Sequence, residues 1–132
     1  MYKTVWLLRR NPAMTQEEFV DYYETTHSKF VGHFKGVVKY FRRYPAQDDS
    51  GGQSAQNTCD CDVIMELWFD SKESFLASHD HDNEADAAFW QAALEDEKKL
   101  FDYGAEGWQR MLVIDVEHET DLSSPHFTST YE

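Results

Sequence analysis

The 132-residue sequence is poor in cysteine, proline and positive charge, with two Cys, three Pro, and 12 Lys and Arg against 25 Asp and Glu. Cys59 and Cys61 are separated by one residue, which is too short a spacing for an easy disulfide, and two thiols supply only half of a tetrahedral zinc site. We therefore expect reduced thiols. The net charge of −13 would repel a phosphate backbone or an anionic membrane surface. We expect no nucleic-acid partner.

Long apolar runs and several well-known enzyme motifs are also missing. No apolar run approaches the roughly 20 residues that span a bilayer, and the opening MYKTVWLLRR has no small-residue cleavage site behind it. We expect no membrane partner and a cytoplasmic location. There is no phosphate loop, serine elbow or dinucleotide fingerprint, so phosphoryl transfer, hydrolysis by an activated serine and nicotinamide chemistry have no support.

What is present indicates one folded domain. Hydrophobic residues make up 41% of the chain and aromatic residues 15%, which is too much for an acidic disordered protein. The length falls in the commonest range for a single domain. We expect a domain over residues 1–118 and a polar tail, ETDLSSPHFTSTYE, over residues 119–132.

The first half of the chain predicts a strand, a helix and a second strand. KTVWLLRR (3–10) is a β-branched and aromatic run that stops at an Asn-Pro turn. Thr15 and Glu18 have the spacing of a capping box, and apolar residues then recur at steps of three and four, so we expect a helix from 15 to the low thirties. VVKYFRRY (37–44) reads as the second strand, and the polar stretch 45–60 reads as a loop.

The second half predicts a third strand, two helical segments and a last strand. CDVIMELWF (61–69) alternates Asp62, Ile64, Glu66 and Trp68 on one face with Val63, Met65, Leu67 and Phe69 on the other. Asp70 and Glu73 suggest a second capping box, opening a short helix that is interrupted near 78–83. A longer helix ends at the glycines of YGAEG. RMLVIDVEH (110–118) reads as the last strand.

This order predicts an α+β fold, the ferredoxin-like β-α-β-β-α-β arrangement of one antiparallel sheet with helices on one face. The strands carry apolar residues on both faces. The face without helices therefore needs another cover, and a second copy of the sheet is the simplest one. We expect a homodimer that forms a dimeric α/β barrel.

Three motifs carry a resemblance to a known family. They are WLLRRNPAMTQEEFVDYYETTHSKFV near the start, DVIMELWFDSKESF in the middle, and LEDEKKLFD with RMLVIDVEH near the end. In this order they resemble the EthD-like members of the dimeric α/β-barrel superfamily. The resemblance implies a small enzyme without cofactors that acts on polyketide, aromatic or lactone intermediates by cyclisation, isomerisation, decarboxylation or dehydration. It also places His27 beside a cavity between helix and sheet.

His27 is the leading candidate for a catalytic residue. It shares a helical face with Tyr23, four residues earlier, so both side chains can reach one volume. An imidazole can remove a proton next to a carbonyl, and a phenol can stabilise the resulting enolate by donating a hydrogen bond. The alternative is a core histidine that is satisfied by a carbonyl group.

Other candidates depend on which face of the third strand turns toward the helix. If it is the Asp62 face, Asp62 could orient His27 as a catalytic partner, and Glu66 and Trp68 could contact a substrate. If it is the opposite face, these residues lie at a dimer surface or in water. Phe30 on the helix and Tyr40 on the second strand are expected to line the apolar pocket.

The stretch SHDHDNEAD could hold a metal, but its contiguous residues on a helix break favour a solvated acidic loop, and we expect no metal site. A resemblance to related cyclases would instead make His81 a second acid or base of the pocket. Asp96 and Glu97 match a family pattern. The segment also reads as an exposed helix with ordinary charge pairs, Glu95 with Lys99 and Asp96 with Lys98 or Lys99, and we favour that structural role.

Two other functions remain open at this point. One is cofactor-free oxygenation of a phenolic, anthrone-like substrate, in which the bound substrate anion itself reacts with oxygen. The other is a binding or carrier protein in which His27 only bonds a bound phenol or carboxylate, since fold does not prove function.

Overall fold

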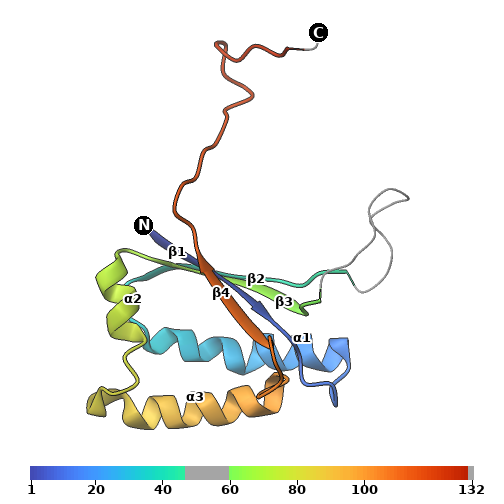
Figure 1. The fold of residues 1–132 in the computed structure, drawn as a ribbon, viewed down its shortest axis with the longest axis vertical. Coiled ribbons are helices and arrows are strands. Elements are labelled where there is room, and N and C mark those ends of the chain that lie inside the picture. Colours follow the sequence, from blue (N-terminus) through green and yellow to red (C-terminus); the bar gives the residue numbers. More distant parts are fainter. Residues whose placement is uncertain (47–59, 131–132) are drawn as a thin grey trace.

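A single antiparallel sheet of four strands organises the fold (Figure 1). The computed structural model describes residues 1–46 and 60–130. Its strands are β1 (Tyr2–Leu8), β2 (Val37–Arg43), β3 (Val63–Phe69) and β4 (Gln109–Val113), and their order in the sheet is β2-β3-β1-β4. Most of the predicted loop 45–60, with Cys59, lies outside the described residues, and Cys61 is buried.

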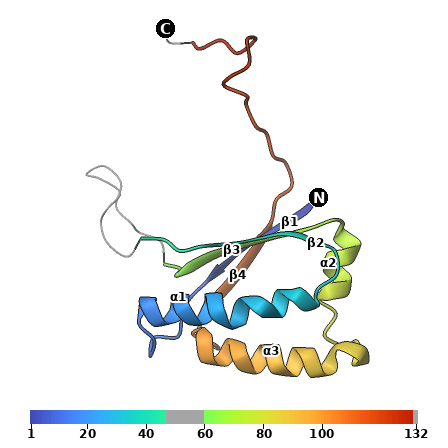
Figure 2. The ribbon, with the colours of Figure 1, turned by 180° about the vertical axis from the view of Figure 1, so that it is seen from behind.

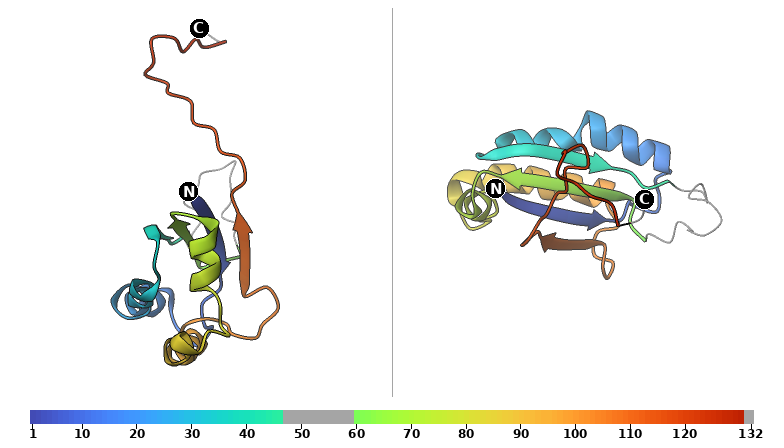
Figure 3. Two further views of the ribbon diagram at one scale, coloured as in Figure 1. Left: turned by 90° about the vertical axis from the view of Figure 1, so that its left-hand side faces the viewer. Right: turned by 90° about the horizontal axis from the view of Figure 1, so that it is seen from above.

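The helices all lie on one side of this sheet (Figures 1 and 2). They are α1 (Gln16–Thr25), the 3-10 helix η1 (His27–His33), α2 (Lys72–Ser78), the 3-10 helix η2 (Glu84–Asp86) and α3 (Ala87–Leu100). The view from above shows α1 and α3 running along the strands (Figure 3). The predicted α+β, ferredoxin-like arrangement is confirmed. None of the helices in the described part of the chain has the length and apolar character needed to cross a membrane.

The first helix begins as predicted and ends earlier. The Thr15 hydroxyl accepts a hydrogen bond from the Glu18 N–H, and the Glu18 carboxylate accepts one from the Thr15 N–H, so the capping box is present. The α-helix stops at Thr25, whose hydroxyl donates to the Asp21 carbonyl at 2.7 Å. Side-chain bonds of this kind bend helices. His27 therefore opens the tighter helix η1 and does not continue α1.

The second helical segment is capped by a different residue than predicted. The Ser71 hydroxyl, not the Asp70 carboxylate, accepts the hydrogen bond from the Ser74 N–H and starts α2. Asp70 instead accepts a bond from the Ser74 hydroxyl at 2.5 Å. The predicted interruption follows, with Asn83 capping η2 and α3 coming directly after it.

The two faces of β3 differ sharply in burial. Val63, Leu67 and Phe69 are at most 2% exposed and lie under the helices. Val63 belongs to a core cluster with Phe19 and Tyr23 of α1, whereas Leu67 and Phe69 form a second cluster with Phe75 of α2. Because side chains alternate along a strand, Ile64, Glu66 and Trp68 lie on the face that carries no helix. We call this helix-free side of the sheet the open face.

A β-bulge in β2 sets which of its residues face the helices. Val37 pairs with Phe69 and Lys39 with Trp68, so Val38 is one extra residue in the ladder. Beyond the bulge, Tyr40 pairs with Leu67 and lies on the helix side of the sheet.

The last strand is shorter than predicted. β4 spans Gln109–Val113, and the Ile114 N–H adds one further bond to the Lys3 carbonyl. Beyond this point the chain leaves the edge of the sheet and runs away from the domain (Figures 1 and 3). β4 is an edge strand that pairs with β1 alone, and its last residue, Val113, is opposite Thr4.

Candidate active site

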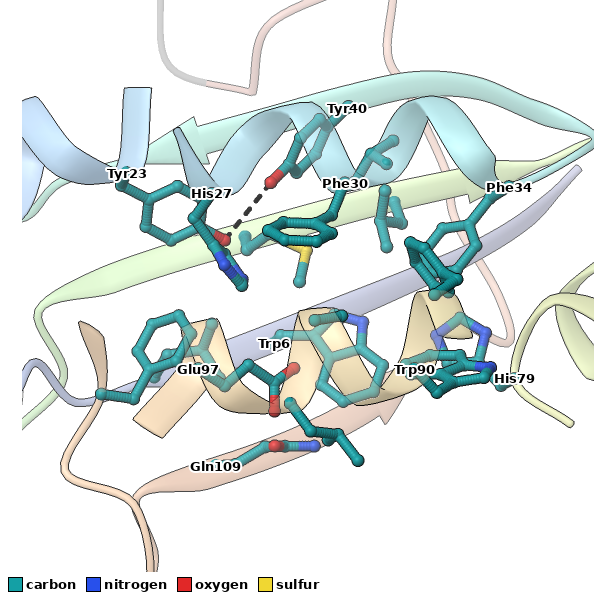
Figure 4. A pocket seen from close by; sticks show the side chains of 18 of the residues that line it. Trp6, Tyr23, His27, Phe30, Phe34, Tyr40, His79, Trp90, Glu97 and Gln109 are labelled. Atoms are coloured by element: carbon teal, nitrogen blue, oxygen red, sulfur yellow. Dashed lines mark hydrogen bonds between the residues drawn. The ribbon is translucent and has the colours of Figure 1, made fainter. Parts of the chain in front are cut away.

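A cavity of about 410 Å³ lies between the helix side of the sheet and the helices α1, η1 and α3 (Figure 4). Its wall is mainly aromatic and aliphatic, as is typical of small-molecule sites. The apolar part includes Trp6, Phe30, Phe34, Met65, Trp90 and Phe101. The polar part consists of Tyr23, His27, Tyr40, His79, His81, Glu97, Tyr103 and Gln109.

His27 is bonded to a buried carboxylate. Its Nδ1 lies 2.7 Å from Oδ2 of Asp96, which is only 7% exposed. The other carboxylate oxygen of Asp96 accepts a hydrogen bond from the Tyr22 hydroxyl. An ionised Asp96 places the proton of a neutral imidazole on Nδ1, which leaves Nε2 as a proton acceptor.

The surroundings of His27 favour the neutral imidazole. Burial lowers the pKa of His27 below its usual value, and hydrogen bonding and charge attraction from Asp96 oppose this shift without overcoming it. The imidazole also packs edge-on against the rings of Tyr23 and Phe101, at centroid distances of 5.3 and 5.5 Å. A neutral, oriented imidazole on a cavity wall has the properties of a general base.

Two tyrosine hydroxyls meet close to His27 (Figure 4). The Tyr40 hydroxyl donates to the Tyr23 hydroxyl at 3.4 Å, so the Tyr23 proton remains available for another acceptor. Burial raises the pKa of Tyr40 to about 12 and that of Tyr23 well above its usual value. Both groups are therefore neutral phenols that can donate hydrogen bonds.

Two further histidines lie toward the other end of the cavity. His79 Nδ1 bonds to the Phe75 carbonyl at 3.1 Å, and its ring stacks on Trp6. Burial is the largest of the causes that lower its pKa, so His79 is also neutral. The centroid of the His81 ring lies 3.9 Å from the centroid of the Trp90 ring.

The sequence of this chain matches a known family over most of the cavity-forming region. Residues 11–104 match the EthD domain. The chain belongs to the EthD family. No protein with curated annotation matches it in sequence.

Solved structures agree with this EthD assignment at the level of the fold. An ethyl tert-butyl ether d (EthD) family protein from Bacillus halodurans has 15% identity and a TM-score of 0.56, with 89% of this chain and 100% of that one covered. HapK from Hahella chejuensis has 9% identity and a TM-score of 0.60, covering 94% and 100%. A dimeric ferredoxin-like protein of unknown function from Thermobifida fusca has 16% identity and a TM-score of 0.55, covering 87% and 90%.

The EthD cavity contains five of the eight residues predicted for the site. These are His27, Tyr23, Phe30, Tyr40 and His81. The other three, Asp62, Glu66 and Trp68, do not line it. The reason is the choice of face on β3, where the wholly apolar side was buried against the helices and the mixed side was left open.

Asp62 is not the partner of His27. Its carboxylate accepts a hydrogen bond from the Arg10 N–H at 2.9 Å and pairs with the Arg10 guanidinium. On the open face, Glu66 accepts bonds from Arg43 and from the indole N–H of Trp68. The ammonium group of Lys3 lies 3.8 Å from the ring centre of Trp68. These contacts give the three residues structural roles that are separate from the cavity.

Asp96 and Glu97 do not lie on an exposed helix face with charge pairs to lysines, as the sequence suggested. Asp96 lies three residues after Ala93 and four before Leu100, and all three are buried. This helical spacing was a usable signal, because it places Asp96 on the buried side of α3. Glu97 lines the cavity, as do Trp90 and Leu94 of the same helix. The partner of Asp96, Tyr22, had no comparable signal in the sequence.

No metal cluster is found in the described ranges 1–46 and 60–130, where no three His, Cys, Asp or Glu side chains converge to hold an ion. In the stretch that contains both His79 and His81, the two rings instead pack against the aromatic residues Phe75 and Trp90.

Proposed function

We propose that this EthD protein is a cofactor-independent enzyme that acts on a small aromatic, polyketide-like or lactone molecule, with His27 as general base or acid. The observation that carries the proposal is the His27–Asp96 pair on the wall of an apolar cavity. A histidine that is oriented by a buried carboxylate is a recurring arrangement for proton transfer.

The chemistry begins with proton removal from carbon. His27 Nε2 accepts a proton from the carbon next to a carbonyl group of the substrate, and the C–H electron pair moves into the enolate. The Tyr23 hydroxyl can stabilise the negative oxygen, because its own proton is free while it accepts from Tyr40. Cyclisation, dehydration and isomerisation can all proceed from such an enolate.

The size and polarity of the cavity support a compact, mostly apolar substrate. A volume of about 410 Å³ lies at the lower end of the range of small-molecule pockets. Aromatic side chains from the sheet and the helices surround it, including Trp6, Phe30 and Trp90, and these suit a planar ring system.

Hydrogen exchange at carbon tests this proposal without the natural substrate. Isochroman-3-one, an aromatic lactone with a CH2 group next to its carbonyl, is incubated with the protein in D2O under nitrogen, and loss of the α-hydrogen signal is followed by NMR. Anthrone, a ketone whose acidic CH2 group is conjugated to the carbonyl across the central ring, is the second compound, and loss of its CH2 signal is followed in the same way. We expect the wild-type protein to accelerate exchange, and His27→Ala to lower the rate by about 10²-fold. The exposed His118 gives the matched control, His118→Ala.

The outcomes separate the possible functions. Undiminished exchange in His27→Ala would remove His27 from the mechanism. Binding of both compounds without any accelerated exchange would contradict the proposed enzymatic activity and would favour a carrier protein. Consumption of oxygen by the anthrone sample under air, coupled to turnover, would favour the oxygenase.

The proposal includes a homodimer formed through the open face. This face carries Val5 and Leu7 of β1 next to Ile64 of β3, with Phe41 and Trp68 beside them. Such a surface is too apolar to face water alone in a typical monomer. The solved structure from Thermobifida fusca, which has the same fold, is described as dimeric.

A further inference from the structure

A second ionisable group faces the same cavity from α3. Glu97 follows Asp96 directly, and successive residues of an α-helix point about 100° apart around its axis. Asp96 therefore turns toward α1 and η1, where it meets Tyr22 and His27. Glu97 turns into the cavity, and its carboxyl group lies across the open space from His27 (Figure 4).

The carboxyl group of Glu97 is not held by the part of the chain that the structure describes. It makes no side-chain hydrogen bond or ion pair with any other described residue, and no Lys or Arg of the described chain lines the cavity. A largely buried carboxyl group that stabilises nothing in the fold is available to a ligand.

The protonation of Glu97 fits the role of an acid. Burial, and next the negative charge of Asp96, raise the pKa of Glu97 to about 7. A substantial fraction of the protein thus carries a protonated Glu97 at neutral pH. The other titratable groups that line the cavity are Tyr23, His27, Tyr40, His79, His81 and Tyr103.

We propose that Glu97 is the acid partner of His27 and that the substrate is an uncharged ketone or lactone. This inference rests on the proposed function. Glu97 donates its proton to the carbonyl oxygen while His27 removes a proton from the adjacent carbon. One C–H bond breaks, one O–H bond forms, and the electron pair becomes the C=C bond of the enol. When the product forms, His27 returns a proton to carbon and Glu97 takes one back from oxygen. Both groups are then in their starting states, so no oxidant or other reactant is needed.

The same arrangement selects against anionic substrates. A carboxylate in the cavity would lie near the negative charge of Asp96 and of the ionised fraction of Glu97, and no cationic side chain among the described residues of the wall would neutralise it. Decarboxylation of a bound carboxylate is therefore disfavoured among the reactions open to this site.

The substitution Glu97→Gln tests the acid role, since it keeps size and hydrogen bonding but cannot transfer a proton. Glu95 is exposed on the same helix, so Glu95→Gln is the matched control. We expect isochroman-3-one exchange to fall by 10- to 100-fold in Glu97→Gln. The wild-type rate should also decline above a pH of about 7, and this decline should be absent from Glu97→Gln and retained in Glu95→Gln.

Carboxyl titration gives a readout that does not require turnover. In protein labelled with ¹³C at the glutamate side-chain carboxyl, one resonance should titrate near 7 and should be missing from Glu97→Gln. Absence of such a resonance would overturn the inference. Anthracene-9-carboxylate should bind at least 10-fold more weakly than anthrone, and equal or tighter binding would overturn the preference for uncharged substrates.

The result also distinguishes this inference from the proposed function. If His27→Ala loses exchange while Glu97→Gln keeps the full wild-type rate and pH profile, Glu97 is not the acid and the function assigned to His27 stands. If His27→Ala exchanges as fast as the wild type, the proposed function itself fails.

Discussion

Nδ1 of His27 lies 2.7 Å from Oδ2 of Asp96, a residue 69 positions later in the chain. The first residue opens η1 and the second lies in α3, so the pair exists only when these two helices are packed together. Tyr22 of α1 bonds to the same carboxylate. Together with Tyr22, the pair therefore joins three helices at the wall of the cavity. It also fixes the direction in which the imidazole can accept a proton.

Asp96→Asn should impair proton transfer while leaving the fold intact. An asparagine can donate its amide N–H to Nδ1, which forces the neutral imidazole to carry its proton on Nε2 and removes the acceptor from the cavity. We expect the exchange rate of isochroman-3-one to fall by about 10²-fold or more, by analogy with other carboxylate-oriented histidines. The exposed residue Asp115 provides the control Asp115→Asn. A wild-type rate in Asp96→Asn would show that the carboxylate does not set the tautomer.

Glu97→Gln should make the protein more stable at high pH. The pKa of Glu97 is about 7 in the folded protein against 4.5 for an ordinary glutamate. Because the pKa is raised in the folded state, Glu97 does not lower the free energy of unfolding at pH values below 4.5. The loss of stability grows as the pH rises toward 7 and is largest above pH 7. The gain from the substitution should therefore be on the order of 2 to 3 kcal/mol at pH 8 and close to zero at pH 4.

Urea unfolding at these two values of pH measures this gain, with Glu95→Gln as the control. A difference between wild type and Glu97→Gln that does not change with pH would contradict the raised pKa.

Much of the fold follows from short-range signals in the sequence. The capping box at Thr15, the apolar spacing along α1 and α3, and the alternation along β3 were sufficient to predict the order of the elements. These signals did not predict the end of α1, where the hydroxyl of Thr25 bonds back to the preceding turn. The local residue pattern indicates which element a segment can form. Hydrogen bonds from side chains to the backbone compete with the helix and influence where it ends.

The site was less predictable than the fold. His27 and Tyr23 were predicted from the helical face that they share and from the family resemblance, and Tyr40 from its place on the second strand; all three line the cavity. Asp96 was set aside because a charged residue in a charged segment resembles a solvated helix face, although its spacing from Ala93 and Leu100 places it on the buried side of α3. For β3 both assignments of the faces were open, and the relative hydrophobicity of the two sides decided between them.

Gly36→Ala should strongly destabilise the protein. Gly36 has a φ of 83°, in the left-handed region, and a Cβ there would lie 2.7 Å from Cβ and Oγ of Ser74 and 2.8 Å from Oδ1 of Asp70. Strain and overlap together should lower the free energy of unfolding by about 2 kcal/mol or more. Gly32→Ala is the control, since nothing lies within 4 Å of its added Cβ. Similar denaturation midpoints for the two variants would contradict the close approach of α2 to this turn.

Ile64→Glu should dissociate the proposed homodimer. Ile64 pairs with Leu7 on the open face, so a carboxylate at this position would be buried between two sheets without a cation provided for it. Sedimentation velocity should show a dimer for the wild-type protein and a monomer for the variant. Leu76→Glu, at a residue that is 54% exposed on α2, should remain dimeric. A wild-type monomer, or a dimer in both variants, would show that the open face is not the interface.

The bulge in β2 bears on how chain length can vary in this strand. Val38 is the extra residue between two regular stretches of the ladder. Lys39 and Tyr40 pair with residues of β3, and Val38 takes no part in this pairing. Loss of Val38 alone would leave every later pair in register, with Tyr40 still beside the cavity. Loss of a residue after the bulge would shift the following side chains to the opposite side of the sheet. One-residue gaps among homologous sequences should therefore be concentrated at Val38, and they should be rare between Tyr40 and Arg43.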